Sequence, residues 1–215
     1  DASIFEYFGY AMNHGQMMYT NLFDHKGPFI FIFNALGYFI AGPLGIKALY
    51  LLSIYLFFYW TYHISRLFSS KTISILVNAI VFIIFENFFE GGWGLEGYVL
   101  PCISYSLFVF LNYALTSKIK PIEVILNGVF FSIVFFTKAN MVGMWLFFSL
   151  YITLCLLYQK KVKELFQLIG LFLSGILLIL VPLFLYLMMN GALTDMFYQS
   201  FIVNMIYSKQ PSEYS

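Results

Sequence analysis

The sequence contains few charged residues, and this scarcity restricts the kinds of protein that it can encode. Only 10% of the 215 residues are charged, whereas 61% are hydrophobic and 22% are aromatic. Soluble domains usually carry about 25% charged residues, so this chain could not cover its own surface with polar groups. The composition excludes an ordinary soluble domain and a disordered chain. The net charge of +1 also argues against a nucleic-acid partner.

Cysteine is equally scarce, and the common motifs of soluble enzymes are missing. Cys102 and Cys155 lie inside apolar runs, where a small buried side chain is a better interpretation than a disulfide or a metal ligand. No P-loop, GxSxG, HExxH or CxxC pattern occurs, so those nucleotide, hydrolase and zinc chemistries lack support. The sequence opens at Asp1 without a leader or a first apolar run, and we expect it to be a fragment.

Long apolar runs dominate the rest of the sequence. A bilayer core about 30 Å thick needs roughly 20 apolar residues per helix. We therefore predict an all-α fold, a polytopic membrane helical bundle that forms a single membrane-embedded module over residues 1–215. Six segments are expected to span the membrane: 45–66, 73–89, 99–117, 122–138, 141–158 and 165–188.

A seventh apolar stretch, residues 29–41, is too short to span comfortably, since it reaches only about 20 Å as a helix. Gly-Pro pairs bound it on both sides, and we predict a re-entrant or interfacial helix. If it does not cross, seven of the eleven basic residues share one side, which the positive-inside rule identifies as cytoplasmic. These are Arg66, Lys71, Lys118, Lys120, Lys160, Lys161 and Lys163. Eight of the ten acidic residues then lie on the outer side.

Amphipathic segments are predicted on the outer side at both ends of the bundle. The first lies in residues 1–28 and the second in residues 190–215, and both are suited to lie in the membrane plane. The predicted fold therefore includes in-plane juxtamembrane helices on the outer face. The helix in the first segment is expected to place four apolar side chains on one face: Ile4, Phe8, Ala11 and Met12.

The polar residues of the outer side fall into three groups, of which the first is Asp24-His25-Lys26. Three ionisable side chains stand in a row just before the short apolar helix. They suit either a charged loop at a helix start or a cluster for anion binding and proton transfer. In the second interpretation Lys26 holds a phosphate and a neighbouring carboxylate acts as a general base.

The second group, residues 89–98, contains four glycines together with Trp93, Glu96 and Tyr98. Glycines let backbone amides approach a ligand, and the two aromatic rings offer stacking faces. A membrane-interface turn with belt aromatics would look similar. Glu96 immediately precedes a span, and an acid at this depth needs water or a partner.

The third group is Lys138-Ala139-Asn140, a turn between two spans on the outer side. Lys138 runs against the positive-inside bias. A lone lysine near a membrane either extends to the interface or meets an anion, and both interpretations remain open.

The first 28 residues resemble the first outer loop of bacterial GT-C glycosyltransferases related to the protein O-mannosyltransferases and the lipid A aminoarabinose transferase. In that family an Asp follows the first span, and an H-K-G-P type motif opens the next apolar helix; Asp1 and residues 25–28 match these features. Residues 90–101 are similar to the Gly-Gly-x-x-x-Glu-x-Tyr segment of the polysaccharide-type branch, and Lys138-x-Asn140 to its Lys/Arg-x-Asn turn. The resemblance covers most of the chain and implies that a first span and a C-terminal part lie outside this sequence.

The resemblance implies a glycosyltransferase of a bacterial plasma membrane whose active site faces outward. It would move a hexose or pentose from a polyprenyl-phosphate donor to a hydroxyl of a glycan, lipid or protein. The transition state should resemble an oxocarbenium ion, so opposite charges are needed close together. Asp1 would be the general base, with Asp24 or His25 as the alternative base or as an orienting group.

The remaining residues would bind substrate. Lys26 and Lys138 would neutralise the lipid phosphate, and Glu96 would orient the sugar or the acceptor. The candidate contacts also include Trp93, Tyr98 and Asn140. No cofactor is certain, although clustered outer acids make a divalent metal conceivable. A transporter or flippase for a polysaccharide or its lipid carrier is the alternative function, and a scaffolding subunit is a third class.

Overall fold

The computed structural model describes residues 2–88 and 94–207, and in these ranges the chain is helical with no β-strand. The all-α class is confirmed. The elements are α1 (Ala2–Asn13), α2 (Phe29–Arg66), α3 (Lys71–Phe88), α4 (Leu95–Thr116), α5 (Pro121–Phe135), a 3-10 turn (Ala139–Met141), α6 (Gly143–Tyr158), α7 (Val162–Met189), α8 (Leu193–Phe197), a π-helical turn (Tyr198–Val203) and α9 (Asn204–Tyr207).

Four helices within the described ranges are long and apolar enough to cross a membrane, and they identify the chain as a membrane protein. They are Phe29–Arg66, Leu95–Thr116, Ala139–Tyr158 and Val162–Met189. The two other predicted spans correspond to shorter apolar helices, Lys71–Phe85 and Pro121–Phe135. Whether these two shorter helices also cross the membrane, as the prediction of six spans requires, stays a prediction. The 15 residues of α5 reach about 22 Å, less than the bilayer core.

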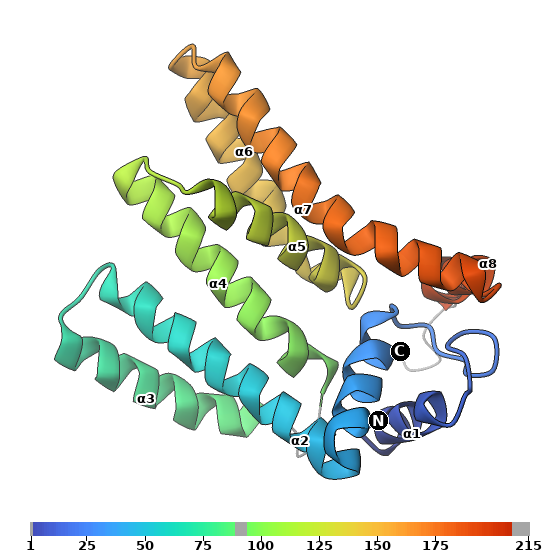
Figure 1. Ribbon diagram of the computed structural model, residues 1–215. Helices are drawn as coiled ribbons and strands as arrows, with labels where there is room; N and C mark the ends of the chain where they lie inside the picture. The colour runs from blue at the N-terminus through green and yellow to red at the C-terminus, as the bar shows by residue number, and fades with distance from the viewer. Residues whose placement is uncertain (1, 89–93, 208–215) are drawn as a thin grey trace, which may run out of the picture.

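Helix α2 changes direction at Ala41 and Gly42, where the backbone leaves helical geometry. Gly42 has a φ of +58°, which residues with a side chain rarely adopt, and Pro43 follows it. Beyond the break the chain packs closely on itself, since a Cβ on Gly45 would lie 2.0 Å from the carbonyl oxygen of Gly37. The end of the short helix predicted at residue 41 is thus confirmed, and Figure 1 shows the two parts of α2 meeting at a sharp angle. Its placement in the membrane plane stays a prediction.

Helices α5 and α7 cross at two glycines with almost no space between their backbones. A Cβ on Gly128 of α5 would lie 2.1 Å from the carbonyl oxygen of Phe172, and a Cβ on Gly175 of α7 would lie 2.0 Å from that of Ile125. Small residues at such crossings allow helices in membranes to approach closely and to gain dispersion contacts. This crossing fixes the position of α5, and hence of the site residues that follow it.

Gly175→Ala is expected to lower the free energy of unfolding by about 1–3 kcal/mol, because the added methyl group forces the two helices apart. The matched control is Gly170→Ala on the same helix, where a Cβ would meet nothing within 4 Å. This control should be neutral or slightly stabilising, since alanine favours a helix over glycine. Thermal unfolding in detergent measures both. Equal midpoints for the two variants would contradict the close crossing.

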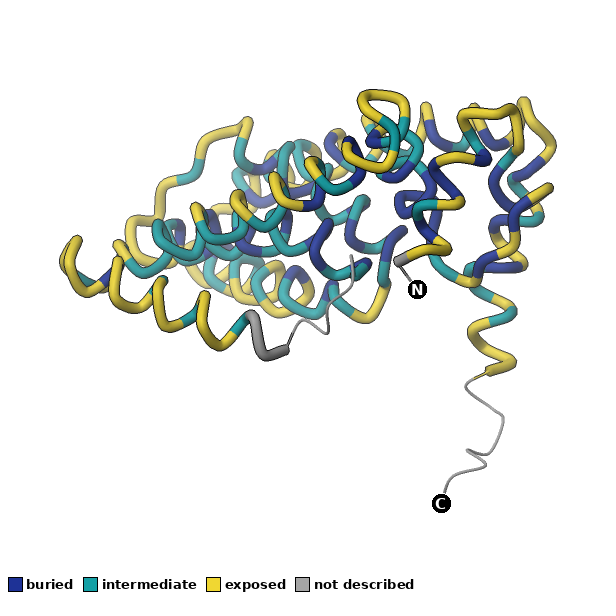
Figure 2. The backbone as a smooth tube through the Cα atoms, turned by 90° about the horizontal axis from the view of Figure 1, so that it is seen from below, coloured by how far each residue is buried: buried dark blue, intermediate teal, exposed yellow. Residues whose placement is uncertain are grey.

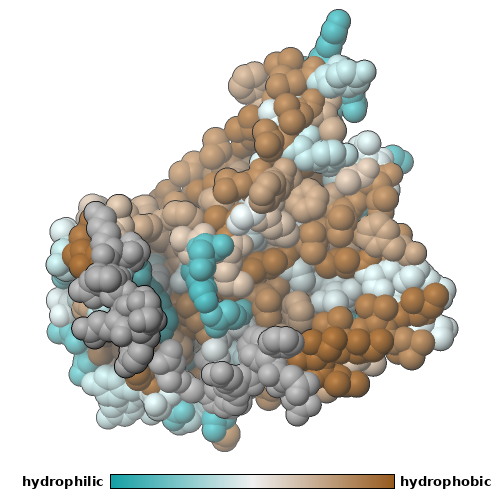
Figure 3. Space-filling model, turned by 180° about the vertical axis from the view of Figure 1, so that it is seen from behind, coloured by the Kyte–Doolittle hydropathy of each residue, from teal (hydrophilic) through white to brown (hydrophobic). Residues whose placement is uncertain are grey.

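The connections between the long helices alternate between two sides of the bundle. Figure 1 shows the α2–α3, α4–α5 and α6–α7 connections on one side and α1 and α8 on the other. The seven basic residues that the charge pattern predicted on one side lie in these three connections or in the helix turns next to them. Apolar side chains cover most of the helical surface between these sides (Figure 3). Which of the two sides is cytoplasmic stays a prediction.

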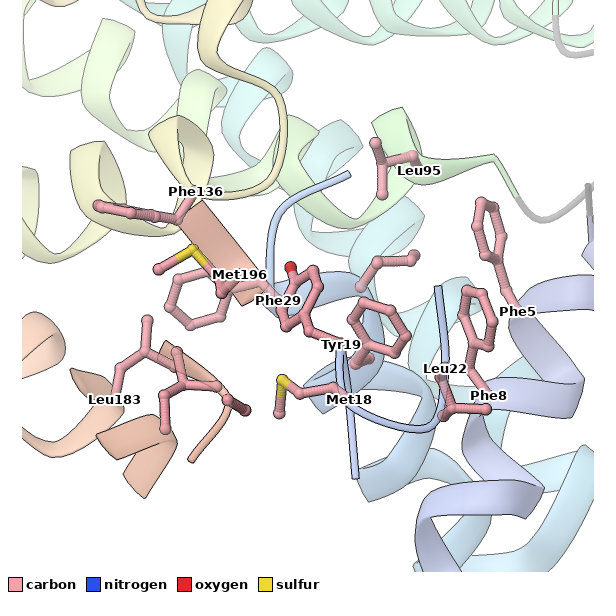
Figure 4. Packing of buried hydrophobic residues seen from close by; sticks show 14 of the residues in the cluster. Phe5, Phe8, Met18, Tyr19, Leu22, Phe29, Leu95, Phe136, Leu183 and Met196 are labelled. Atoms are coloured by element: carbon pink, nitrogen blue, oxygen red, sulfur yellow. The ribbon is translucent and has the colours of Figure 1, made fainter. Parts of the chain in front are cut away.

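The main core lies at the end that carries α1 and α8, and exposed positions follow the outer turns of the long helices (Figure 2). Figure 4 shows side chains of the loop after α1, such as Met18 and Tyr19, gathered with Met196 of α8. Helix α1 joins this core through Phe5 and Phe8. The predicted apolar face of α1 is therefore correct for Phe8 and Ala11, which are buried, and for Met12, which packs against the core, but wrong for Ile4, whose exposed fraction is 49%.

Candidate functional site

A cavity of about 630 Å³ opens at the α1 and α8 end of the bundle. Five segments of the chain form it: α1, the loop before α2, the start of α4, the end of α5 with the turn after it, and the C-terminal helical segment. Its lining contains both aromatic and ionisable side chains. The polar lining residues are His25, Lys26, Glu96, Thr137, Lys138, Asn140, Ser200 and Asn204.

An ion pair between Lys138 and Glu96 crosses the cavity. Glu96 stands in the first turn of α4, where the helix dipole favours a carboxylate. Lys138 follows the end of α5 and has an extended backbone, with φ −153° and ψ 88°. Both side chains remain more than one-third exposed. The pair is therefore accessible from the cavity and contributes little to stability, since solvent screens it.

Lys26 reaches the same cavity from the loop before α2. Its ammonium group lies 4.6 Å from the ring centroid of Phe5, a cation–π contact. Its backbone N–H donates to Oδ1 of Asp24 at 2.9 Å, and its carbonyl oxygen accepts from the hydroxyl of Tyr19 at 2.8 Å. Burial raises the pKa of that hydroxyl, so Tyr19 stays protonated and keeps donating. Local hydrogen bonds thus fix the backbone that carries Lys26.

The C-terminal segment holds this loop through three polar side chains that the sequence analysis did not single out. Gln199 donates to the carbonyl oxygen of Tyr19 at 2.7 Å, Ser200 donates to that of Lys26 at 3.1 Å, and Asn204 donates to that of His25 at 2.7 Å. A π-helical turn, a feature often found at functional sites, carries the first two. The sequence did contain one indication of their role, because two amides and a hydroxyl within six residues are unusual in an apolar segment.

Gly27 brings the loop into direct backbone contact with the end of α5. A Cβ at this position would lie 1.7 Å from the carbonyl oxygen of Phe136 and 2.4 Å from its carbonyl carbon. Only glycine therefore permits the observed approach. The contact places Lys26 beside Thr137 and Lys138, which explains why the two lysines share one cavity.

The rest of the wall is apolar and continues into the helical surface. Phe135, Phe136 and Phe201 pack together, with ring centroids 5.1–6.2 Å apart. Leu95 and Met205 complete this side. The cavity thus combines ionisable groups with an aromatic flank.

The structure brings together five of the nine predicted site residues: His25, Lys26, Glu96, Lys138 and Asn140. Asp24 lies next to them, but its buried carboxylate points to the loop backbone and stands 3.6 Å from Nδ1 of His25. Tyr98 lies elsewhere, in the core, stacked on Phe33 at 5.2 Å. Asp1 and Trp93 fall outside the described residues.

The fold and the cavity define a class, a helical membrane protein with a cavity lined by ionisable and aromatic side chains at one end of its bundle. Among residues 2–88 and 94–207, no group of three His, Cys, Asp or Glu side chains could hold a metal ion. Comparisons with family models, curated proteins and solved structures find no match to this chain.

Proposed function

We propose that the protein is a glycosyltransferase that takes a sugar from a polyprenyl-phosphate donor and transfers it to an acceptor hydroxyl at the outer face of a bacterial plasma membrane. The observation that carries the proposal is the convergence of Lys26 and Lys138 on one apolar-flanked cavity. The two come from segments more than a hundred residues apart. Two ammonium groups beside one apolar-flanked cavity suit an anionic ligand, for which Lys138 would exchange its contact with Glu96.

A sugar phosphate attached to a polyprenyl chain matches both parts of the cavity. Lysine ammonium groups form strong, charge-assisted hydrogen bonds with phosphate oxygens. The aromatic flank of Phe135, Phe136 and Phe201 suits the first isoprene units, which must leave the bilayer beside the phosphate. A soluble sugar nucleotide would have no use for that flank.

The charges of the cavity also suit the transfer step. The acceptor oxygen forms a bond to the anomeric carbon, and the bond from that carbon to the phosphate oxygen breaks. The phosphate leaves with the electron pair, stabilised by Lys26 and Lys138, and the hydroxyl proton passes to a general base. Among the described residues, His25 lines the cavity and can take this role, with the Asp24 carboxylate 3.6 Å from its Nδ1 to orient it. Asp1 remains the base that the family resemblance implies.

The direct test is the release of polyprenyl phosphate from a labelled polyprenyl-phosphate sugar by membranes that contain the full-length protein. Lys26→Met is expected to lower this release by about 10- to 100-fold, the cost of losing one hydrogen bond to a charged group. The matched control is Lys71→Met, an exposed lysine at the first position of α3, which should leave the rate unchanged.

Each other outcome counts against the proposal. Movement of intact donor across the membrane without cleavage of its sugar would identify a transporter. A scaffold would neither cleave nor move the donor. An equal rate for Lys26→Met and Lys71→Met would remove the phosphate-binding role of the cavity.

A further inference from the structure

A second cavity, of about 600 Å³, lies at the opposite end of the α5 and α7 pair. It is bounded by the α4–α5 connection and by the first three turns of α7. No residue of the first cavity contributes to it. The proposed transfer reaction makes no use of it.

Polarity changes along this second cavity in one direction. Lys161, Lys163, Glu164 and Gln167 line it near the start of α7, whereas Leu168 and Leu171 line it further into the apolar helix. At about 1.5 Å per residue, the distance from Lys161 to Leu171 is about 15 Å. A phospholipid has the same profile over that length, with a polar head followed by the upper part of an acyl chain.

Charge favours an anionic head. Lys161 pairs with Glu164 at 3.7 Å, whereas Lys163 makes no ion pair with any residue that the structure describes. Lys118 and Lys120 stand in the facing α4–α5 connection, on either side of the cavity-lining Ile119. Lysines at a membrane surface attract anionic lipids, and basic pockets between membrane helices bind their headgroups.

We propose that this second cavity binds an anionic phospholipid, with the phosphate on Lys161 and Lys163 and an acyl chain along Leu168 and Leu171. The site lies at the membrane surface opposite the first cavity and is independent of the transfer reaction. The positive-inside rule alone would account for lysines on this side of the membrane. It would not account for a cavity beside them that is lined further along by Leu168 and Leu171.

The test compares lipid retention by the full chain, purified from mixed vesicles of phosphatidylglycerol and phosphatidylcholine and analysed by native mass spectrometry. The native protein is expected to retain phosphatidylglycerol over phosphatidylcholine by about tenfold, the preference that one to two lysines give near an anionic lipid. The variant K161Q/K163Q should retain the two lipids equally. K161R/K163R should keep the preference, and K71Q is the control for a lysine outside the cavity.

Three results would overturn the proposal. The first is an equal preference in the native protein and K161Q/K163Q, which would mean that the preference comes from the overall charge of the surface and not from this cavity. The second is retention of phosphatidylcholine as strong as that of phosphatidylglycerol by the native protein. The third is displacement of the lipid by glycerol 3-phosphate at millimolar concentration, which would indicate a site for a free phosphate. Matching helical content and melting temperature of K161Q/K163Q and K71Q ensure that folding is not the cause.

Discussion

Lys138→Met is expected to reduce the release of polyprenyl phosphate by about 100- to 1,000-fold, the cost of removing one group that stabilises a developing negative charge. Lys138 lines the same cavity as Lys26, and its ammonium group already pairs with the carboxylate of Glu96. Because Lys138 would contact the leaving phosphate in the transition state, we expect its loss to lower kcat. The melting temperature should change little, because both side chains of the pair are more than one-third exposed.

A double-mutant cycle with Glu96→Gln separates the two roles that Lys138 could have. If Lys138 only neutralises Glu96, the variant Lys138→Met/Glu96→Gln should recover most of the lost activity. If Lys138 binds the phosphate, the double variant should stay as slow as Lys138→Met, and Lys138→Arg should retain a large part of the rate. Recovery in the double variant would contradict the assignment.

The fold could largely be predicted because its main signals are local. Apolar runs mark the long helices, and Gly42-Pro43 marks the break in α2. The length of α5 could not be predicted in this way. The predicted span runs to residue 138, but the helix ends at Phe135, next to the contact between Gly27 and Phe136. That contact joins segments more than a hundred residues apart, and no local pattern reports it.

The site could be predicted in part because charge is rare in this chain. Lys26, Glu96 and Lys138 stand out against apolar surroundings, and the structure places all three on one cavity. Tyr98 was predicted to contact substrate only because its ring offers a stacking face. It lies three residues after Leu95, hence on the same side of α4, and both are buried in the same core cluster.

The contacts of the C-terminal segment lay beyond sequence reasoning for a different reason. Gln199, Ser200 and Asn204 act on backbone carbonyl oxygens 174–180 residues away. A carbonyl group is present at every residue, so the sequence does not indicate which of them a distant amide will bind. These side chains would have been found only from their scarcity in an apolar helix.

Gly27→Ala is expected to reduce the release of polyprenyl phosphate by about 100-fold, although it removes no functional group. The methyl group would lie 1.7 Å from the carbonyl oxygen of Phe136, so the loop must move away from α5 by at least about 1 Å. Misplacement of a binding group by this distance can cost about 100-fold in rate. The control is Gly143→Ala at the start of α6, where a Cβ would meet nothing within 4 Å. It should retain native activity.

The same variant distinguishes the placement of Lys26 from a general loss of structure. If Gly27 acts by holding Lys26 beside Lys138, adding Lys26→Met to Gly27→Ala should cost little more, because the ammonium group is already misplaced. Helical content should stay native, since the α5 and α7 crossing at Gly128 and Gly175 is untouched. A full additional loss on adding Lys26→Met would show that the two residues act independently. The effect of Gly27→Ala would then not come from the placement of Lys26 in the cavity.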